Sequence, residues 1–507
     1  MNLYDLLASR FPAGGAAPCL ILPGGRRVSY AELESQSARY GALLVDAGLK
    51  PGDRVAAQVE KSAEALFLYL GCLRAGGVFL PLNPAYTRGE VAYFLDDARP
   101  GLFVCAPERR EEAQELAWAC RLPLVHDLGA RGEGSLAAAA AQMPAHLATV
   151  ERADGDLASI VYTSGTTGRS KGAMLTHRNL AANALVLHRY WGFRPGDVLL
   201  HVLPTFHVHG LYVATHCALL NGSPMLYEPK FDAPRALRLL REATVFMGVP
   251  TYYVRLLQEQ GLTREAVAHM RLFISGSAPL LPETFAAFRE RTGHTLLERY
   301  GMTEGGMFTS NPLEGERRGG TVGFPLPGTE VRVVGEDDAP LPAGGIGHIQ
   351  VRGDNVFAGY WDMPEKTKEA FTPEGYFRTG DLGRFDAEGY LAIIGRDKDL
   401  IISGGLNVYP KEIEEAIDAL PGVAESAVIG LPHPDFGEAV TAVVVRVRDA
   451  PGLTAEGLIA ALKGNIAGFK VPKAVHFVDD LPRNAMGKVQ KNRLRERFGD
   501  AGESQSP

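Results

Sequence analysis

The chain has 507 residues and a formal net charge of −7, and 46% of its residues are apolar. That length exceeds what one hydrophobic core usually holds, so we expect two or more domains. A mildly acidic chain without a long basic run argues against nucleic acid as the main partner. The chain also contains no stretch of roughly 18 apolar residues, which argues against a transmembrane helix and a membrane partner.

Cysteine usage and the first residues bear on the compartment. The five cysteines lie far apart and include no CxxC pair, which is typical of buried reduced thiols. Residues 1–11 contain no long apolar stretch, so we expect no signal peptide. They include Asp5 and only one basic residue, Arg10, which is weak evidence for a transit peptide. We therefore expect a soluble, cytoplasmic protein with reduced thiols at Cys19, Cys72, Cys105, Cys120 and Cys217.

Helical and strand patterns alternate through the first part of the chain. Such alternation indicates an α/β fold with largely parallel sheets and covering helices. The Ala/Gly-rich stretch 132–149 is interpreted as a covering helix and loop without chemistry. The expected helices are 30–47 and 63–75, and the expected strands are 54–59, 158–162, 198–203, 245–249 and 272–275.

The pattern changes near residue 396. A predicted strand at 389–394 leads into the polar connector 395–399, and an amphipathic helix follows at 410–420. Further strands are predicted at 424–430, 440–447 and 474–478. We expect a large N-terminal domain, 1–397, and a small, mobile α+β C-terminal domain, 398–507.

A Ser/Thr/Gly-rich loop follows the predicted strand 158–162. Its sequence from Tyr162 to Gly172 is YTSGTTGRSKG. Glycines allow close backbone approach, and hydroxyls, amides and Lys171 suit phosphate oxygens. The spacing between the glycines and the lysine differs from that of a P-loop. The alternative to a phosphate-binding loop is an ordinary flexible loop on the surface.

The loop resembles the phosphate-binding signature of the adenylate-forming superfamily, which includes acyl-CoA synthetases, firefly luciferase and peptide-synthetase adenylation domains. Five further segments are similar to signatures of that family, in the same order along almost the whole chain. They are LPTFH at 203–207, GSAPL at 276–280, YGMTE at 300–304, TGD at 379–381 and the connector GRDKD at 395–399. A sixth segment, PRNAMGK at 482–488, resembles the C-terminal loop that bears the adenylation lysine.

The resemblance implies an acid–thiol ligase that uses ATP, Mg²⁺ and coenzyme A and passes through an acyl-adenylate. Lys488, His207, Thr303 and Glu304 are then the expected catalytic residues, with Glu304 on the metal. Asp381 would take the ribose hydroxyls, and Lys398 would be the hinge about which the C-terminal domain rotates before the thiol attacks. The implied ATP contacts are Thr163, Ser164, Gly165, Thr166, Thr167, Gly168, Lys171, Gly276, Ser277, Ala278, Glu298, Tyr300, Gly301, Met302, Thr303, Asp381, Arg396 and Lys488.

Charge neutralisation explains why these residue types suit the reaction. The attacking carboxylate and the α-phosphate of ATP are both anions, so Lys488 and Mg²⁺ are the expected stabilisers of the transition state. Gly404 and Gly405 match the face that would narrow a coenzyme A tunnel. The alternative for Lys488 is a solvated lysine on the surface without a catalytic role. The alternative for Gly404 and Gly405 is an ordinary tight turn.

Two arginines bear on which acid is used. Arg255 falls where acyl-pocket residues of the family cluster, and Arg299 immediately precedes the YGMTE motif, where many relatives carry a small or neutral residue. A buried guanidinium is costly without an anionic partner. A second carboxylate on the substrate would supply that partner, with His207 and Ser277 beside it. The segments around both arginines are similar to those of malonyl-CoA synthetases, which implies malonate as the acid and weaker use of methylmalonate.

Other interpretations remain open. Either arginine could form a structural ion pair, Arg255 could lie on an exposed helix face, and His209 could serve packing. A short- or medium-chain acyl-CoA synthetase is one alternative function. An adenylation enzyme that loads a separate carrier protein is another.

Overall fold

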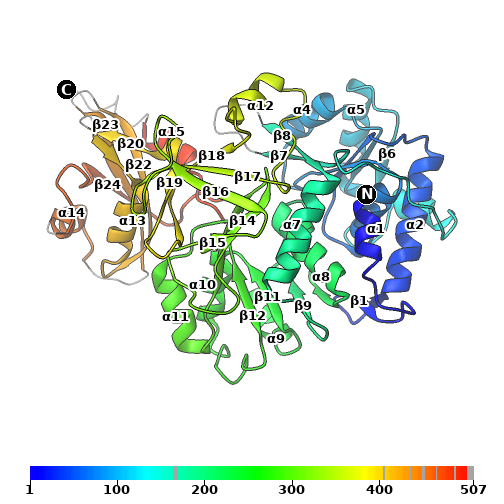
Figure 1. The fold of residues 1–507 in the computed structure, drawn as a ribbon, viewed down its shortest axis with the longest axis horizontal. Coiled ribbons are helices and arrows are strands. Elements are labelled where there is room, and N and C mark those ends of the chain that lie inside the picture. Colours follow the sequence, from blue (N-terminus) through cyan, green and yellow to red (C-terminus); the bar gives the residue numbers. More distant parts are fainter. Residues whose placement is uncertain are drawn as a thin grey trace.

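The computed structural model describes residues 1–163, 170–403, 406–433, 436–447, 452–463, 465–484 and 487–499. Its strands form four sheets, and helices cover the two largest (Figure 1). The predicted class, with largely parallel α/β sheets before a smaller α+β C-terminal part, is confirmed.

The first sheet has six strands in the order β6-β5-β3-β4-β7-β8, and all pairs are parallel except β7 with β8. Ser29 and Ser62 cap the helices α2 and α3, which start where the sequence predicts. The predicted helices and strands of this part are confirmed to within one residue. The strands are β3 Arg54–Gln58, β4 Val78–Pro81, β5 Leu102–Cys105, β6 Val125–Asp127, β7 Leu157–Thr163 and β8 Lys171–Thr176; the helices are α2 Tyr30–Asp46, α3 Ala63–Arg74, α4 Arg88–Ala98, α5 Arg110–Ala119 and α6 Ser135–Ala141.

The second sheet has nine strands in the order β15-β14-β13-β12-β11-β9-β10-β1-β2. Its centre, from β1 to β13, is parallel, and every residue of β11 and β12 is buried, as expected for strands covered on both faces. The strands are β1 Pro18–Ile21, β2 Arg27–Ser29, β9 Leu199–His201, β10 Met225–Tyr227, β11 Val245–Gly248, β12 Leu272–Ser275, β13 Leu297–Met302, β14 Gly306–Ser310 and β15 Phe324–Pro325. The accompanying helices are α1 Leu3–Ala8, α7 His177–Tyr190, α8 Thr215–Asn221, α9 Ala233–Leu239, α10 Pro250–Gln258 and α11 Pro282–Thr292.

A four-stranded antiparallel sheet, of which the sequence predicted only the strand 389–394, precedes the C-terminal part. It consists of β16 Thr329–Val334, β17 Gly347–Gly353, β18 Phe377–Phe385 and β19 Leu391–Arg396, with α12 Pro364–Ala370 beside it. The interpretation of 395–399 as a polar connector is wrong for its first two residues, because Gly395 and Arg396 pair with Leu382 and Asp381 in β19. A short 3-10 helix, Asp397–Asp399, follows.

The C-terminal part contains a sheet of its own. Two apolar clusters there draw only on residues after 400, so this part has its own core. The predicted helix 410–420 is confirmed but ends at Asp418. The elements are β20 Ile401–Ser403, β21 Leu406–Val408, β22 Val423–His433, β23 Gly437–Arg446 and β24 Ala474–Val478, with α13 Pro410–Asp418, α14 Ala455–Lys463 and α15 Lys491–Gly499.

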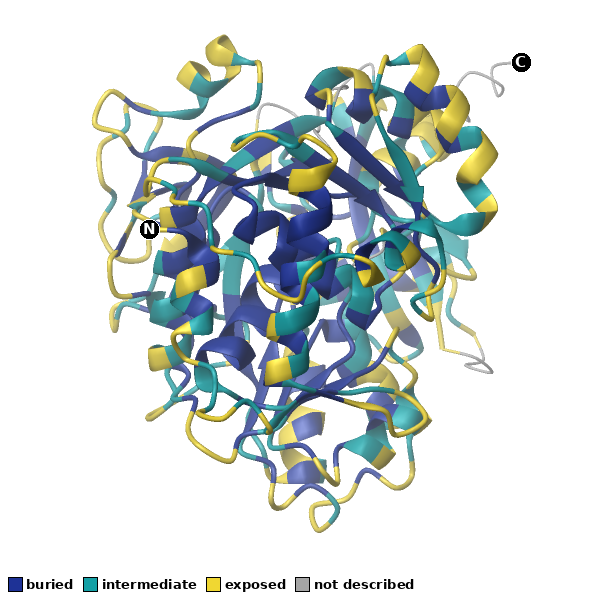
Figure 2. Ribbon diagram, turned by 90° about the vertical axis from the view of Figure 1, so that its right-hand side faces the viewer, coloured by how far each residue is buried: buried dark blue, intermediate teal, exposed yellow. Residues whose placement is uncertain are grey.

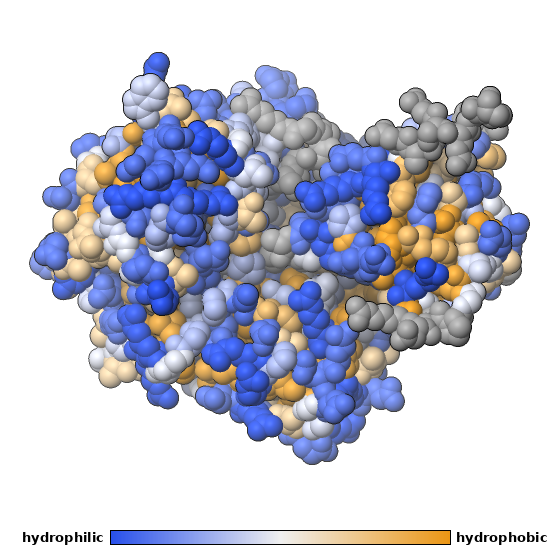
Figure 3. Space-filling model, turned by 180° about the vertical axis from the view of Figure 1, so that it is seen from behind, coloured by the Kyte–Doolittle hydropathy of each residue, from blue (hydrophilic) through white to orange (hydrophobic). Residues whose placement is uncertain are grey.

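Burial follows the layers, with buried strands and helix faces inside and exposed residues at turns and outer helix faces (Figure 2). Hydrophilic residues dominate the face seen from behind, and apolar ones gather over the C-terminal part (Figure 3). All five cysteines are free thiols, of which Cys120 is only half-buried. Among the described residues, no helix has the length and apolar character needed to cross a membrane.

Candidate active site

The carboxyl ends of neighbouring parallel strands bring the predicted motifs to one edge of the nine-stranded sheet. Gly248 is paired with Ser275, and Ser275 with Glu298, so the segments after β11 and β12 lie beside the middle of β13. The segment that carries His207 follows β9, the neighbour of β11. The crevice at the carboxyl ends of parallel strands is the usual place for ligands in α/β sheets.

Arg299, on β13, is a buried cation without a complete set of partners. It is only 2% exposed, and its Nε and Nη2 have no hydrogen-bond partner in the part of the chain that the structure describes. A Cβ atom at Gly276 would lie 2.4 Å from its Cζ, so the glycine makes room for the guanidinium. Burial lowers the pKa of Arg299 to about 9, against the opposing influence of Tyr253 and Glu298. An anion is the ligand that this group lacks.

Two histidines and a serine are close to this cation. Burial, followed by the charge of Arg299, lowers the pKa of His207 to about 4 and that of His209 well below its usual range, so both rings are neutral near pH 7. Ser277 Oγ lies 3.2 Å from His209 Nδ1. The backbone of Ser277 has a φ of +72°, which is uncommon for a residue other than glycine. His209 Nε2 is buried and has no partner among the described residues.

Arg255 differs from the prediction of a buried guanidinium. It is exposed, because α10 buries Pro250, Tyr253 and Leu256 on one face, and Arg255 projects from another. The premise of a costly buried charge therefore applies to Arg299 and is wrong for Arg255. Whether Arg255 contacts the acid stays a prediction.

Asp381, on β18, joins two strands of different sheets. Its Oδ2 accepts a hydrogen bond from Tyr300 Oη at 2.5 Å, and its Oδ1 forms an ion pair with Arg396 Nε at 2.8 Å. Asp381 is buried, so its carboxylate is held in one orientation at the meeting point of β13, β18 and β19. This group of three residues brings together side chains that the sequence assigned to ribose and nucleotide.

Glu304 is a buried carboxylate with few partners. Its Oε1 accepts from Tyr360 Oη at 3.1 Å, and burial raises its pKa. Lys171 Nζ lies 4.2 Å from the ring centre of Tyr360, which brings the predicted phosphate lysine near the predicted metal ligand. Mg²⁺ is usually held by one or two carboxylates and by phosphate oxygens, so Glu304 fits the role of a protein ligand. Thr303 is half-buried beside it.

The predicted phosphate loop connects the antiparallel pair β7 and β8. Thr163 and Lys171 face each other across this pair, so the two ends of the loop are close together. Both residues are half-buried. The residues predicted to contact phosphate between them, Ser164, Gly165, Thr166, Thr167 and Gly168, lie outside the described residues.

Glu298 was predicted as an ATP contact and is 5% exposed. Its Oε1 accepts from the backbone N–H of Leu280, which belongs to the predicted adenine loop, at 3.2 Å. Burial raises its pKa to about 7, although the charge of Lys411 acts in the opposite direction. In the predicted adenine loop, Gly276 is buried and Ala278 is half-buried; Gly301 and Met302 are half-buried on β13.

Lys488 reaches the predicted nucleotide site from the C-terminal part. The residue as a whole is exposed, yet its ammonium group is surrounded by protein atoms, and burial lowers its pKa to about 8. The charges of Arg396 and Asp381 act on it in opposite directions. Gly487 lies beside Thr251 of α10, so this loop touches the N-terminal part. Lys398 is exposed on the 3-10 helix, and Gly404 and Gly405 lie outside the described residues.

Several side chains that support the site were not identified from the sequence. Asn183 and Asn355 both donate to the carbonyl of Met307, and Asn355 also donates to that of Gly305, so they hold the backbone just after Glu304. Tyr360 bonds Glu304 itself. Isolated asparagines and tyrosines carry no local pattern that would reveal these contacts.

Comparisons with known proteins agree with this arrangement. A family model described as AMP-binding enzyme matches residues 9–361, and one described as AMP-binding enzyme C-terminal domain matches 412–488. A malonate–CoA ligase of Arabidopsis thaliana is 36% identical over 93% of this chain and 85% of its own. ATP-bound MatB from Rhodopseudomonas palustris is 54% identical over 99% of each chain, with a TM-score of 0.96, and apo MatB from the same organism matches over the same share with a TM-score of 0.84.

Proposed function

The chain belongs to the AMP-binding enzymes, and on that premise we propose that it is a ligase that forms malonyl-CoA, AMP and pyrophosphate from malonate, ATP and coenzyme A. The observation that carries the choice of acid is Arg299, a buried guanidinium with unbonded N–H groups beside neutral His207 and Ser277. The distal carboxylate of malonate supplies the missing anion. The similarity to a malonate–CoA ligase supports the same acid.

In the first step, an oxygen of the other carboxylate attacks the α-phosphorus of ATP, and the bond to pyrophosphate breaks. Lys488 and Thr303 stabilise the charge that develops on the phosphate oxygens. Glu304 holds Mg²⁺, which neutralises phosphate charge when it is bound. Asp381 takes the ribose hydroxyls beside Arg396, and the 163–171 loop with Lys171 takes the phosphates, while the adenine lies against 276–278 and Tyr300.

In the second step, the thiol of coenzyme A attacks the acyl carbon, the bond from that carbon to the phosphate oxygen of AMP breaks, AMP leaves, and the thiol proton passes to solvent. The C-terminal domain, 398–507, rotates about Lys398 so that Lys488 withdraws and Gly404 and Gly405 line the coenzyme A tunnel. Ile402 and Leu406, which flank these glycines, are exposed large apolar side chains. Apolar residues in that position are suited to a face that is covered in another arrangement of the domains.

The close similarity to ATP-bound MatB, compared with apo MatB, supports assigning the present arrangement to the adenylation step. Malonate, ATP and coenzyme A are small soluble molecules, and we place the reaction in the cytoplasm. Methylmalonate is used more weakly, because one methyl group in a pocket is worth only about 1–3 kcal/mol.

The test is AMP release in the presence of ATP, Mg²⁺ and coenzyme A, with malonate, methylmalonate, succinate, acetate and octanoate in parallel. Turnover concentrated on malonate is expected. A preference for acetate or octanoate would favour a short- or medium-chain acyl-CoA synthetase. Acyl transfer to a holo carrier protein with none to coenzyme A would favour a carrier-loading enzyme.

A further inference from the structure

A second buried cation, Lys61, is not part of any motif in the sequence, but it contacts the backbone of one. Lys61, between β3 and α3, is 6% exposed, and its Nζ lies 2.7 Å from His201 Nδ1, 2.8 Å from the carbonyl oxygen of His201 and 3.1 Å from that of Leu203. Its ammonium also lies 4.2 Å from the ring centre of Tyr227. An ammonium group has three N–H donors, and here each of them has an acceptor.

The bonds of His201 fix the protonation of this pair. His201 Nε2 lies 3.0 Å from the carbonyl oxygen of Gly210, which only accepts, so Nε2 carries the proton. Nδ1 of the neutral ring must then accept from Lys61. Burial lowers the pKa of Lys61 well below its usual range, against the charge of Glu228, but its two carbonyl acceptors and His201 Nδ1 together require three donated protons, which only the charged form has.

Lys61 and His201 together hold both ends of one segment. Lys61 bonds the backbone at 201 and 203, where the segment leaves β9, and the His201 ring bonds Gly210, where the π-helix His209–Ala214 begins. Thr215 Oγ1, 3.1 Å from His201 Nε2, also donates to Gly210. The segment 203–210 carries His207 and His209, the neutral histidines beside Arg299.

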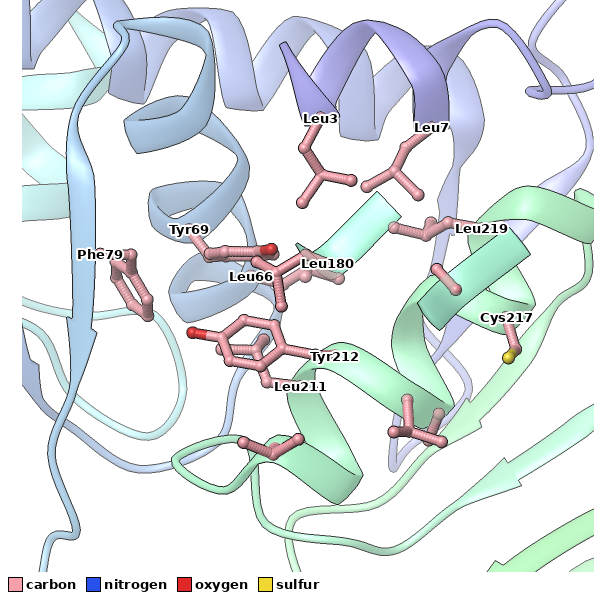
Figure 4. Packing of buried hydrophobic residues seen from close by; sticks show 14 of the residues in the cluster. Leu3, Leu7, Leu66, Tyr69, Phe79, Leu180, Leu211, Tyr212, Cys217 and Leu219 are labelled. Atoms are coloured by element: carbon pink, nitrogen blue, oxygen red, sulfur yellow. The ribbon is translucent and has the colours of Figure 1, made fainter. Parts of the chain in front are cut away.

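A small cavity, lined mainly by apolar side chains, lies behind this segment. Thr205, Phe206 and Leu211 line it, together with Tyr227 and with residues in or next to β3, α3 and β4. Figure 4 shows three of these residues, Leu66, Tyr69 and Phe79, packed near Leu211 and the neighbouring Tyr212. Thr205 and Phe206 thus have the cavity on one side and lead directly into His207.

We propose that Lys61 and His201 are positioning residues for acid selection, which clamp the 203–210 segment and keep the acyl site separate from the apolar cavity. The proposal rests on the proposed function, because the acid bound beside His207 is taken to be malonate. Loosening the clamp displaces His207 and opens the site toward apolar space, so binding of the diacid weakens while the nucleotide site is unaffected.

The experiment compares Lys61→Met with Arg74→Met in malonate-dependent pyrophosphate release. Arg74 is also 6% exposed and donates to backbone carbonyls, with Nη1 2.8 Å from Glu34 O, but it lies away from the 203–210 segment. For Lys61→Met we expect the KM for malonate to rise about tenfold or more, since small displacements at a reacting centre cost up to about 10²-fold. The KM for ATP should stay as in Arg74→Met, the preference for malonate over butyrate should fall, and Lys61→Arg should recover part of the loss.

Equal KM values for malonate in Lys61→Met and Arg74→Met, or a parallel rise in the KM for ATP, would overturn the clamp. If Lys61→Met does not fold, Thr215→Val removes one contact of His201 at constant shape and should show the same KM pattern more weakly. Hydrogen exchange of 203–210 gives a readout without substrate: faster exchange in Lys61→Met than in Arg74→Met is expected, and equal exchange contradicts the clamp. An unaltered chain that does not use malonate would instead overturn the proposed function.

Discussion

Two buried cations, Arg299 and Lys61, have opposite hydrogen-bond situations. Arg299 is 2% exposed and leaves Nε and Nη2 without partners among the described residues, whereas each donor of Lys61, at 6% exposure, meets an acceptor. A buried donor without an acceptor is destabilising, and a bound anion would complete the hydrogen bonding of Arg299. A buried cation whose donors all have acceptors, such as Lys61, holds the backbone segments that it bonds in place. The difference separates a substrate receptor from a structural clamp.

The largest expected effect comes from Arg299→Met. Removing one member of a buried charge pair with the substrate should lower kcat/KM for malonate by about 10²–10³-fold. Because the guanidinium is incompletely paired without ligand, the free energy of unfolding should not fall, whereas Lys61→Met should lower it by about 1–3 kcal/mol through orphaned carbonyls. Steady-state kinetics and urea unfolding of both variants check this. A large loss of stability in Arg299→Met would indicate a structural cation instead.

The surroundings of Lys488 make its ammonium group easier to deprotonate. Its pKa is lowered to about 8, so the ammonium is present below that pH and is lost as the pH rises through 8. Single-turnover pyrophosphate release should therefore decline above pH 8, and Lys488→Met should be about 10²–10³-fold slower. Rapid-quench measurements from pH 6.5 to 9.5 check both expectations. The decline should be missing in Lys488→Met, and its persistence there would assign it to another group.

Gly276→Ala tests the space that Arg299 needs. The new methyl group would lie 2.4 Å from Cζ of the guanidinium, so the arginine must move. We expect kcat/KM for malonate to fall about 10–10²-fold, since displacing a substrate-binding group by about 1 Å lowers the rate by factors of this order. The KM for malonate and the dissociation constant of ATP, the latter by calorimetry, separate the acyl site from the adenine contact. A change confined to ATP would show that the glycine serves the nucleotide.

Arg255→Ala should have the smallest effect. Because the side chain is exposed, the free energy of unfolding should change by no more than about 0.5 kcal/mol. An exposed ion pair with substrate is worth about 1 kcal/mol at most, so kcat/KM for malonate should fall about fivefold or less. The same kinetic assay checks this, with the KM for ATP as the control. A loss as large as that of Arg299→Met would make Arg255 an equal partner in diacid recognition.

Local sequence patterns determined the elements and the family. Capped helices such as α2 and α3 and the buried strands β11 and β12 were predictable because their apolar spacing and boundary residues act over short distances. Predicted nucleotide residues such as Tyr300, Asp381 and Arg396 lie together, because Asp381 on β18 accepts a hydrogen bond from Tyr300 of the nine-stranded sheet and pairs with Arg396 on the adjacent β19. Of the antiparallel sheet β16–β19, only the strand at 389–394 was predicted, and the pairing itself was missed, since long-range pairing leaves little trace in any short window.

Only the tertiary structure decided which charges are buried and which are paired. Arg255 and Arg299 look alike in the sequence, but the helix face of α10 leaves one exposed, and β13 carries the other into the interior. Lys61 meets His201 across 140 positions of the chain, and Asn355 meets Met307 across 48. Desolvation and hydrogen-bond completion depend on every atom around a group, so the sequence alone could name the cations but not divide them into receptor and clamp.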